Sequence, residues 1–161
     1  MIRKLEESDA IAVLDIYQQG LDTGEASFET RAPNWTTWDE KHHRFGRLLA
    51  EQNDQIQGWA ALAPVSLRDC YRGVAEISIY VSSNHRGRGV GNILMTALID
   101  ASERNGIWSL YSSIFPENEA TLRLHQRHGF RQVGVRERIA QQQGRWRNTM
   151  ILERRSTSIG A

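Results

Sequence analysis

The amino-acid sequence predicts a single mixed α/β (α+β) domain with a partly parallel central sheet flanked by helices. Strand and helix patterns follow one another in the order β-α-α-β-β-α-β-α-β-β, over a length of 161 residues that suits one domain. A strand followed by a helix and another strand favours a parallel crossover, which gives the parallel part of the sheet. We expect residues 1–155 to form the domain and the small, polar tail 156–161 to fray.

The first elements are a strand at 2–4 and two helices. Ser8 is a candidate cap for a helix that keeps apolar residues at helical spacing to about Gly20. Thr37 and Glu40 have the spacing of a capping box, which predicts a second helix over 37–51.

The middle of the chain carries the clearest patterns. QIQGWAALA at 55–63 and VAEISIYV at 74–81 predict strands, the second rich in β-branched residues that alternate between faces. Residues 90–104 place their apolar side chains on one stripe and end at Asn105-Gly106, which predicts an amphipathic helix. A further strand is expected at 107–115.

The last elements are a short helix and a hairpin. A helix is expected over 119–128, closed by Gly129, and strands over 130–138 and 147–153 on either side of a turn at Gly144.

Composition excludes several classes of protein. Twenty basic and 19 acidic side chains give a net charge of +1, so no overall basic surface points to nucleic acid. No apolar run is long enough to cross a bilayer, and MIRKLEESDA lacks the apolar segment of a secretory signal, so we expect a cytoplasmic protein with no membrane partner. The lone Cys70 and the adjacent His42 and His43 suggest no metal site.

HRGRGVGN, residues 85–92, links the strand at 74–81 to the helix at 90–104. A helix N-terminus with free N–H groups attracts phosphate, and glycines let the backbone approach it closely. Arg86 and Arg88 can add charge-assisted hydrogen bonds, so the loop suits a pyrophosphate. The alternative is a flexible connector with solvated arginines.

Two common phosphate-binding motifs do not fit. No Gly-Lys pair is present, which excludes a P-loop, and the dinucleotide pattern G-x-G-x-x-G has Asn92 in place of its last glycine.

R-x-x-G-x-G, at Arg86, Gly89 and Gly91, resembles the acyl-CoA pyrophosphate loop of the GNAT superfamily of N-acetyltransferases. PENEATLRLHQRHGF, residues 116–130, is similar to a later helix of that fold, although His125 stands where many members have tyrosine. The resemblance implies a GNAT-like fold and acetyl-CoA as co-substrate.

Three further segments resemble the phosphinothricin and methionine sulfoximine N-acetyltransferases: IYQQGLDTGEASFET, YRGVAEISIYVS and GRWRNTMILERR. The resemblance implies acetyl transfer to the amino group of a small amino-acid analogue, herbicide or antibiotic resistance as a role, and a homodimer. Acetylation of a protein N-terminus or a polyamine is an alternative, as is a CoA-binding sensor without chemistry.

Two side chains are candidates for catalysis. Glu76 is a charged residue within an apolar strand, where burial would raise its pKa and make it a better base. Alternation also allows it to face solvent with Ser78 and Tyr80. His125 is a candidate general acid toward the CoA thiolate or a partner in amine deprotonation, and the alternative is a packed or exposed helix residue.

The resemblance also implies binding residues. The pantetheine arm would pair with the backbone of one strand, whose N–H near Val81 would donate to the acyl oxygen, and the pyrophosphate would lie on the loop. The residues expected at the cofactor are Ile79, Tyr80, Val81, Arg86, Gly87, Arg88, Gly89, Val90, Gly91, Asn92 and Asn118. Asn118 is also a candidate helix cap.

An amino-acid substrate needs a cation for its carboxylate, and a guanidinium suits that group. Arg72 precedes the strand that carries Glu76, although an arginine in a loop is usually solvated. The residues expected at the substrate are Phe28, Glu29, Thr30, Tyr71, Arg72 and Gly73.

Overall fold

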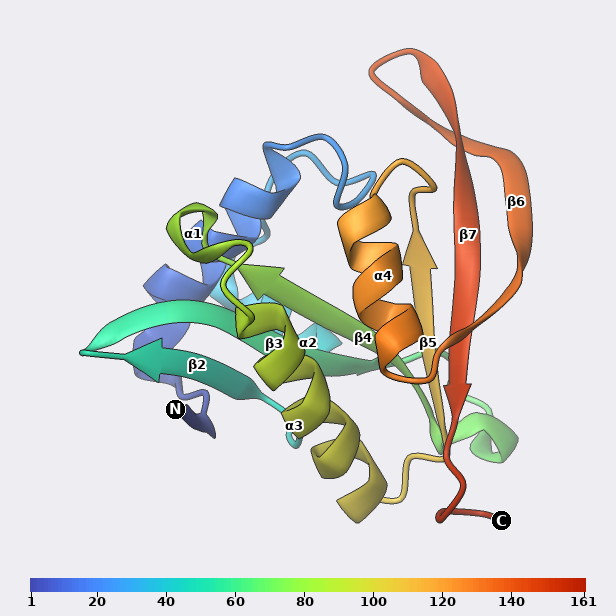
Figure 1. Ribbon diagram of the computed structural model, residues 1–161, viewed down its shortest axis with the longest axis horizontal. Coiled ribbons are helices and arrows are strands. Elements are labelled where there is room, and N and C mark those ends of the chain that lie inside the picture. The colour runs from blue at the N-terminus through green and yellow to red at the C-terminus, as the bar shows by residue number, and fades with distance from the viewer.

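The computed structural model describes residues 1–161 and contains one seven-stranded sheet in the order β1-β2-β3-β4-β5-β7-β6 (Figure 1). The strands are β1 (Ile2–Lys4), β2 (Leu48–Gln52), β3 (Gln55–Pro64), β4 (Val74–Val81), β5 (Ser109–Ile114), β6 (Arg131–Gln142) and β7 (Arg145–Arg155). The α-helices are α1 (Ala10–Leu21), α2 (Trp35–Lys41), α3 (Val90–Arg104) and α4 (Glu119–Arg127). Only β4 and β5 are parallel, so the predicted mixed, partly parallel sheet is confirmed.

Apolar side chains cover both faces of the sheet. One core cluster joins alternate β4 residues, Ala75 and Ile77, to the buried stripe of α3. A second joins Val13 of α1 and Trp38 of α2 to Trp59 of β3. The helices therefore sandwich the sheet, with α3 and α4 on the side nearer the viewer in Figure 1.

The prediction of a helix over 37–51 is wrong beyond Lys41, where the helix ends. It begins earlier, because the Asn34 side chain accepts a hydrogen bond from Thr37 N–H at 2.9 Å, and it ends where His42 becomes extended. Residues 48–52 instead form β2, which pairs with β1 on one side and β3 on the other. An apolar run of this length suits either structure, and here pairing within the sheet decides it.

Ser8 does not cap α1. A short 3₁₀ turn over Glu7–Asp9 precedes the helix, and the Asp9 carboxylate accepts from Glu6 N–H at 2.8 Å. Arg3 also donates to both Asp9 oxygens at 2.9 Å, so this carboxylate fixes the helix start against β1. The other predicted elements are present and differ only at their ends.

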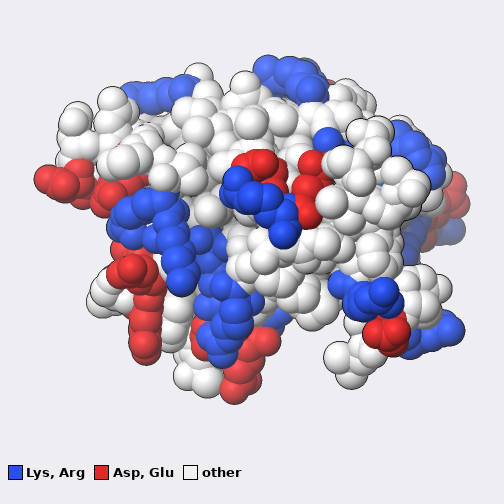
Figure 2. Space-filling model, turned by 90° about the horizontal axis from the view of Figure 1, so that it is seen from below, with Lys and Arg blue, Asp and Glu red and all other residues white.

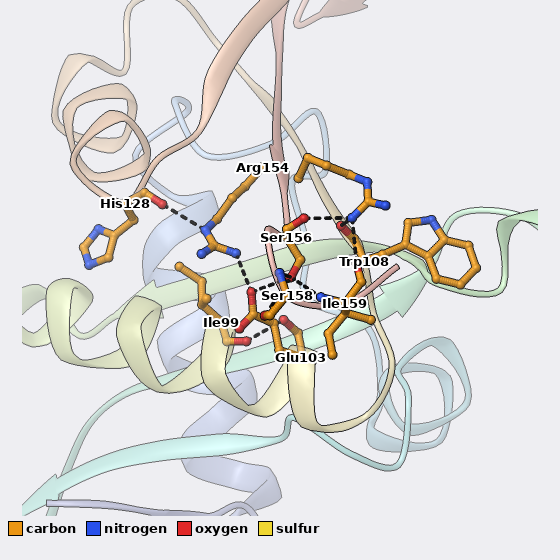
Figure 3. Close-up of polar contacts among 10 residues, drawn as sticks. Ile99, Glu103, Trp108, His128, Arg154, Ser156, Ser158 and Ile159 are labelled. Atoms are coloured by element: carbon orange, nitrogen blue, oxygen red, sulfur yellow. Dashed lines mark hydrogen bonds and ion pairs between the residues drawn. The ribbon is translucent and has the colours of Figure 1, made fainter. Parts of the chain in front are cut away.

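The C-terminal tail, which was expected to fray, is folded against the end of α3 (Figure 3). The Ser156 hydroxyl is buried and donates to the Glu103 carboxylate at 2.8 Å, and Arg154 donates to the same carboxylate at 3.1 Å. The N–H groups of Ser158 and Ile159 donate to the Ser156 oxygen.

Basic and acidic side chains lie intermixed on the face shown in Figure 2. Several pair within the fold, as Arg3 does with Asp9 and Arg47 with Asp39. No helix is both long and apolar enough to cross a membrane.

A buried histidine makes the stability of the fold depend on pH. His42 packs on Trp38, and burial lowers its pKa from 6.5 to about 4. Because the unfolded state binds the proton more readily, stability is full above about pH 6.5 and falls as the pH drops toward 4. Between about pH 7.5 and pH 5, the wild type should lose about 1 to 2 kcal/mol more than His42→Phe in urea denaturation. Equal losses would contradict this assignment.

The sheet opens between its two parallel strands. Pairing of β4 with β5 ends at Glu76–Tyr111, whereas β5 stays paired with β7 to Ile114. Figure 1 shows the two strands diverging beyond this point with α4 beside the gap. Ser82 N–H donates to Gln57 of β3, so by alternation the N–H and C=O groups of Ile77, Ile79 and Val81 face the gap.

Candidate active site

A cavity of about 610 Å³ occupies the gap between β4 and β5. Its walls are β4 from Glu76 to Val81, residues 112–115 at the end of β5, and α4 with the residues that precede it. The loop at 23–28 closes one side, and the β4–α3 loop lies at one end. The splayed sheet therefore forms the long cleft in which most of the predicted site residues meet.

The β4–α3 loop provides a cradle of backbone donors. None of the N–H groups from Gly87 to Asn92 donates to an acceptor within the chain. Gly87 and Gly89 have φ of 72° and 83°, and a Cβ atom on either would point into open space. Free N–H groups at the start of a 15-residue helix suit a phosphate group.

The arginines of the loop lie in different places. Arg86 lines the cavity, and its guanidinium donates to the Val81 and Gln19 carbonyls at 3.4 and 3.3 Å. Arg88 and Asn92 are exposed and do not line the cavity.

Substitution of Gly89 tests the cradle. Gly89→Val places a branched side chain at a φ of 83°, which strains the backbone and puts bulk beside the free N–H groups. We expect affinity for acetyl-CoA, measured by calorimetry, to fall at least about 10-fold. Gly106→Val, at a similar φ of 79° but at the far end of α3, is the control and should keep that affinity. Unchanged binding by Gly89→Val would exclude the loop as the phosphate site.

Glu76 begins the β4 wall of the cleft, at the end away from the β4–α3 loop, and is half-buried and without a hydrogen-bond partner in the chain. Burial raises the pKa of its carboxyl group, and the positive charge of Lys41 opposes this rise. Its neighbours on the same face, Ser78 and Tyr80, also line the cavity, and Tyr80 packs on Tyr17 of α1 at 4.7 Å between ring centroids. The alternative of a solvent-facing strand surface is therefore wrong.

His125 of α4 lines the same cleft as Glu76. Its Nδ1 lies 2.7 Å from the Thr121 carbonyl oxygen, its ring packs edge-on against Phe130, and its Nε2 is buried without a partner. A carbonyl only accepts, so Nδ1 carries the proton and Nε2 presents a lone pair. Burial lowers the pKa of His125 from 6.5 to about 4, so the ring is neutral near pH 7. The geometry favours a hydrogen-bond acceptor over the general acid suggested by the sequence.

Asn118 has the capping role that the sequence allowed. Its side-chain oxygen accepts from Thr121 N–H at 3.3 Å, and its amide donates to the Glu25 carbonyl at 3.1 Å. It lines the cavity and ties α4 to the loop at 23–28.

Of the residues predicted to bind the substrate, only one lines the cavity. Phe28 lines the cavity and packs on Phe115 at 4.9 Å, but Glu29 and Thr30 are exposed outside it. Tyr71, Arg72 and Gly73 lie before β4, at the end of the strand away from the cradle, and none lines the cavity. The Arg72 guanidinium instead pairs with Asp69 at 3.3 Å and lies over Trp108.

Two basic residues of the site were missed by the sequence. Lys41, the last residue of α2, lines the cavity, and a lysine at a helix end gives no signal of its own. Arg147 of β7 is buried and pairs with Glu25 at 2.7 Å and Glu117 at 3.2 Å. Its guanidinium also lies 3.7 Å from the centroid of the Phe115 ring, so it fastens the 23–28 loop over the cavity. A sequence signal for Arg147 exists, because it is a basic residue at a position of the strand where alternation places the side chain on the buried face with Thr149.

The fold and the cavity together define a group-transfer enzyme, with an anion cradle and a titratable carboxylate in one cleft. The Acetyltransferase (GNAT) family matches residues 11–130. The chain therefore belongs to the acetyltransferase (GNAT) family, as the sequence resemblance predicted, and it is an enzyme.

Relatives and solved structures agree with this assignment. The chain is 28% identical over 157 residues to an L-methionine sulfoximine/L-methionine sulfone acetyltransferase of Salmonella typhimurium, covering 94% of this chain and 92% of that protein. It is 32% identical over 163 residues to a phosphinothricin N-acetyltransferase of Alcaligenes faecalis, covering 95% and 81%. A Salmonella typhimurium protein solved with its cofactor acetyl-CoA is similar with a TM-score of 0.92 at 26% identity, covering 100% of this chain and 96% of that one. A ribosomal-protein-alanine N-acetyltransferase from Brucella melitensis has a TM-score of 0.90 at 29% identity, covering 97% and 99%.

Proposed function

We propose that the protein transfers the acetyl group of acetyl-CoA directly to the amino group of a small amino-acid analogue such as methionine sulfoximine or phosphinothricin. The observation that carries the proposal is the cleft itself, which joins a backbone anion cradle to a half-buried carboxylate of raised pKa. The names of the relatives support the acceptor class.

The residues of the cleft suit each part of acetyl-CoA as substrate. The N–H groups of 87–92 with Arg86 would bind the pyrophosphate, and the outward backbone groups of Ile79 and Val81 would pair with the pantetheine arm. The side chain of Tyr80 lies on the other face of the strand, so its part is that of an apolar wall beside Glu76. Cys70 is exposed and does not line the cavity, which supports transfer without a cysteine intermediate.

The transfer breaks one bond and forms another. The amine must be neutral to attack the acetyl carbon, and Glu76 accepts the proton that it loses, directly or through a water. As the C–N bond forms and the C–S bond breaks, negative charge develops on the acetyl oxygen, where the N–H of Val81 can donate. CoA leaves as the thiolate and takes a proton from water; His125, neutral and with a free Nε2 lone pair, would accept a hydrogen bond from such a water at the sulfur end.

Thiol release with purified protein tests the function. Acetyl-CoA is supplied with methionine sulfoximine, phosphinothricin, ordinary amino acids, spermidine or a short peptide in parallel. We expect selective release with the first two. Release only with the peptide or the polyamine would show that the acceptor is not an amino-acid analogue. CoA binding without thiol release in any mixture would favour a CoA-binding sensor.

We also propose a homodimer and a role in resistance to such amino-acid analogues. Val133, Val135, Ile139 and Trp146 of the projecting β6–β7 hairpin expose 44 to 58% of their surface, and a second chain would cover them. A monomeric mass by light scattering would contradict the dimer. Growth of a sensitive bacterium on phosphinothricin, with and without the expressed protein, tests the resistance.

A further inference from the structure

Lys41 is a basic side chain on the cavity wall at the end of the cleft that holds Glu76, away from the β4–α3 loop, which we call the acceptor end. It ends α2, is solvent-accessible, and lines the cavity together with Glu76 and Tyr17. Arg86 is the one other lysine or arginine on the cavity wall, and it lies at the phosphate cradle. Lys41 makes no ion pair with any carboxylate of the chain.

The other titratable groups at this end are neutral or already paired. Burial lowers the pKa of His125 to about 4 and raises the pKa values of Tyr17 and Tyr80, so all three are uncharged near pH 7. Glu25 is paired with Arg147. On the cavity wall the charges left at this end are the Glu76 carboxylate and the Lys41 ammonium, and the latter lies near enough to oppose the rise in the Glu76 pKa. The Glu29 carboxylate is exposed outside the cavity, and its negative charge acts on Tyr17 and Tyr80.

An amino-acid acceptor carries its amine and its carboxylate on the same carbon. If the amine lies against Glu76, its carboxylate is held within a few ångströms of that residue and needs a cation there, because an unpaired buried charge is costly. Arg72, the cation expected from the sequence, lies outside the cavity and is paired with Asp69.

We propose that Lys41 binds the carboxylate of the acceptor and thereby selects amino acids over simple amines. The inference rests on the proposed acetyl transfer and adds the residue that sets its acceptor specificity. The lysine ammonium is a compact charge on a flexible stem, so it can bind the carboxylate of acceptors with different side chains, such as a phosphinate or a sulfoximine, without a fixed planar geometry.

The test compares two acceptors that differ only at the carboxylate: methionine sulfoximine and its carboxamide. In Lys41→Met, kcat/KM for methionine sulfoximine should fall about 10- to 100-fold, mainly through KM, and kcat/KM for the carboxamide should change little. Lys41→Arg keeps the charge and should recover most of the loss. Lys4→Met, at the other lysine of the chain, exposed on β1, is the matched control.

A second readout is the pH dependence of kcat/KM. Removing the Lys41 charge raises the pKa of Glu76 further, so the acidic limb should move to higher pH in Lys41→Met and stay in place in Lys41→Arg.

The outcomes separate this inference from the proposed function. Wild-type turnover with equal kcat/KM losses for acid and amide in Lys41→Met, or no loss, overturns the role of Lys41 and leaves acetyl transfer intact. A selective loss in Arg72→Met with none in Lys41→Met assigns the carboxylate to Arg72 instead. No turnover of any amino acid by the wild type refutes the proposed function, and the role of Lys41 with it.

Discussion

Glu76→Gln is expected to lower kcat at least about 100-fold and to leave affinity for acetyl-CoA unchanged, because glutamine keeps the size of the side chain but cannot accept the amine proton. The raised pKa of Glu76 also predicts that wild-type kcat/KM falls as the pH drops through that pKa and the base becomes protonated. The residual activity of the variant should lack this limb.

Steady-state kinetics and calorimetric titration with acetyl-CoA measure the two effects. Glu40→Gln, a substitution of the same kind at an exposed position of α2, is the control and should behave as the wild type. A Glu76→Gln enzyme with wild-type kcat and an unchanged pH profile would show that another group accepts the proton.

Arg147→Met is expected to have the largest effect on stability. The change leaves Glu25 and Glu117 without their partner and removes the donor to the Gly24 carbonyl, beneath a loop that closes the cavity. Breaking a buried ion pair costs about 3 to 5 kcal/mol. Both carboxylates are about half exposed, which reduces the cost to about 2 to 3 kcal/mol here.

Urea denaturation measures this loss, and Arg145→Met, an exposed arginine of the same strand, is the matched control. We also expect KM for the acceptor to rise in Arg147→Met, because the loop that carries Phe28 loses its anchor. Equal stability of the two variants would show that Arg147 is not what holds the loop.

Much of the fold could be predicted from local pattern. VAEISIYV and the helix after it have a strong period and clear ends, and the β4–loop–α3 unit appears as expected. The error at β2 arose where an apolar run suits either helix or strand and only its neighbours in the sheet decide. The packing of Ser156, the first residue of the tail, could not be predicted for a similar reason, since its contact with Glu103 joins residues far apart in the sequence.

Two parts of the site could be predicted because local sequence determines them: the backbone cradle of the β4–α3 loop and the carboxylate on β4. The cradle depends on glycines next to a helix start, and Glu76 stands out as a charge within an apolar strand, so both are visible in sequence. Lys41 and Arg147 are ordinary surface-type residues until the fold places Lys41 on the cavity wall and Arg147 beneath the loop that closes it. Arg72 shows the converse, because it is close to Glu76 in sequence but its side chain pairs with Asp69 and does not line the cavity.

Mass spectrometry of the product formed from acetyl-CoA and methionine sulfoximine by the purified protein tests direct transfer to the amine. We predict methionine sulfoximine carrying one acetyl group on its α-amino nitrogen, formed by the wild type and nearly lost in Glu76→Gln. Release of thiol without an acetylated acceptor, or acetyl groups found on Cys70, would contradict direct transfer in the cleft between β4 and β5.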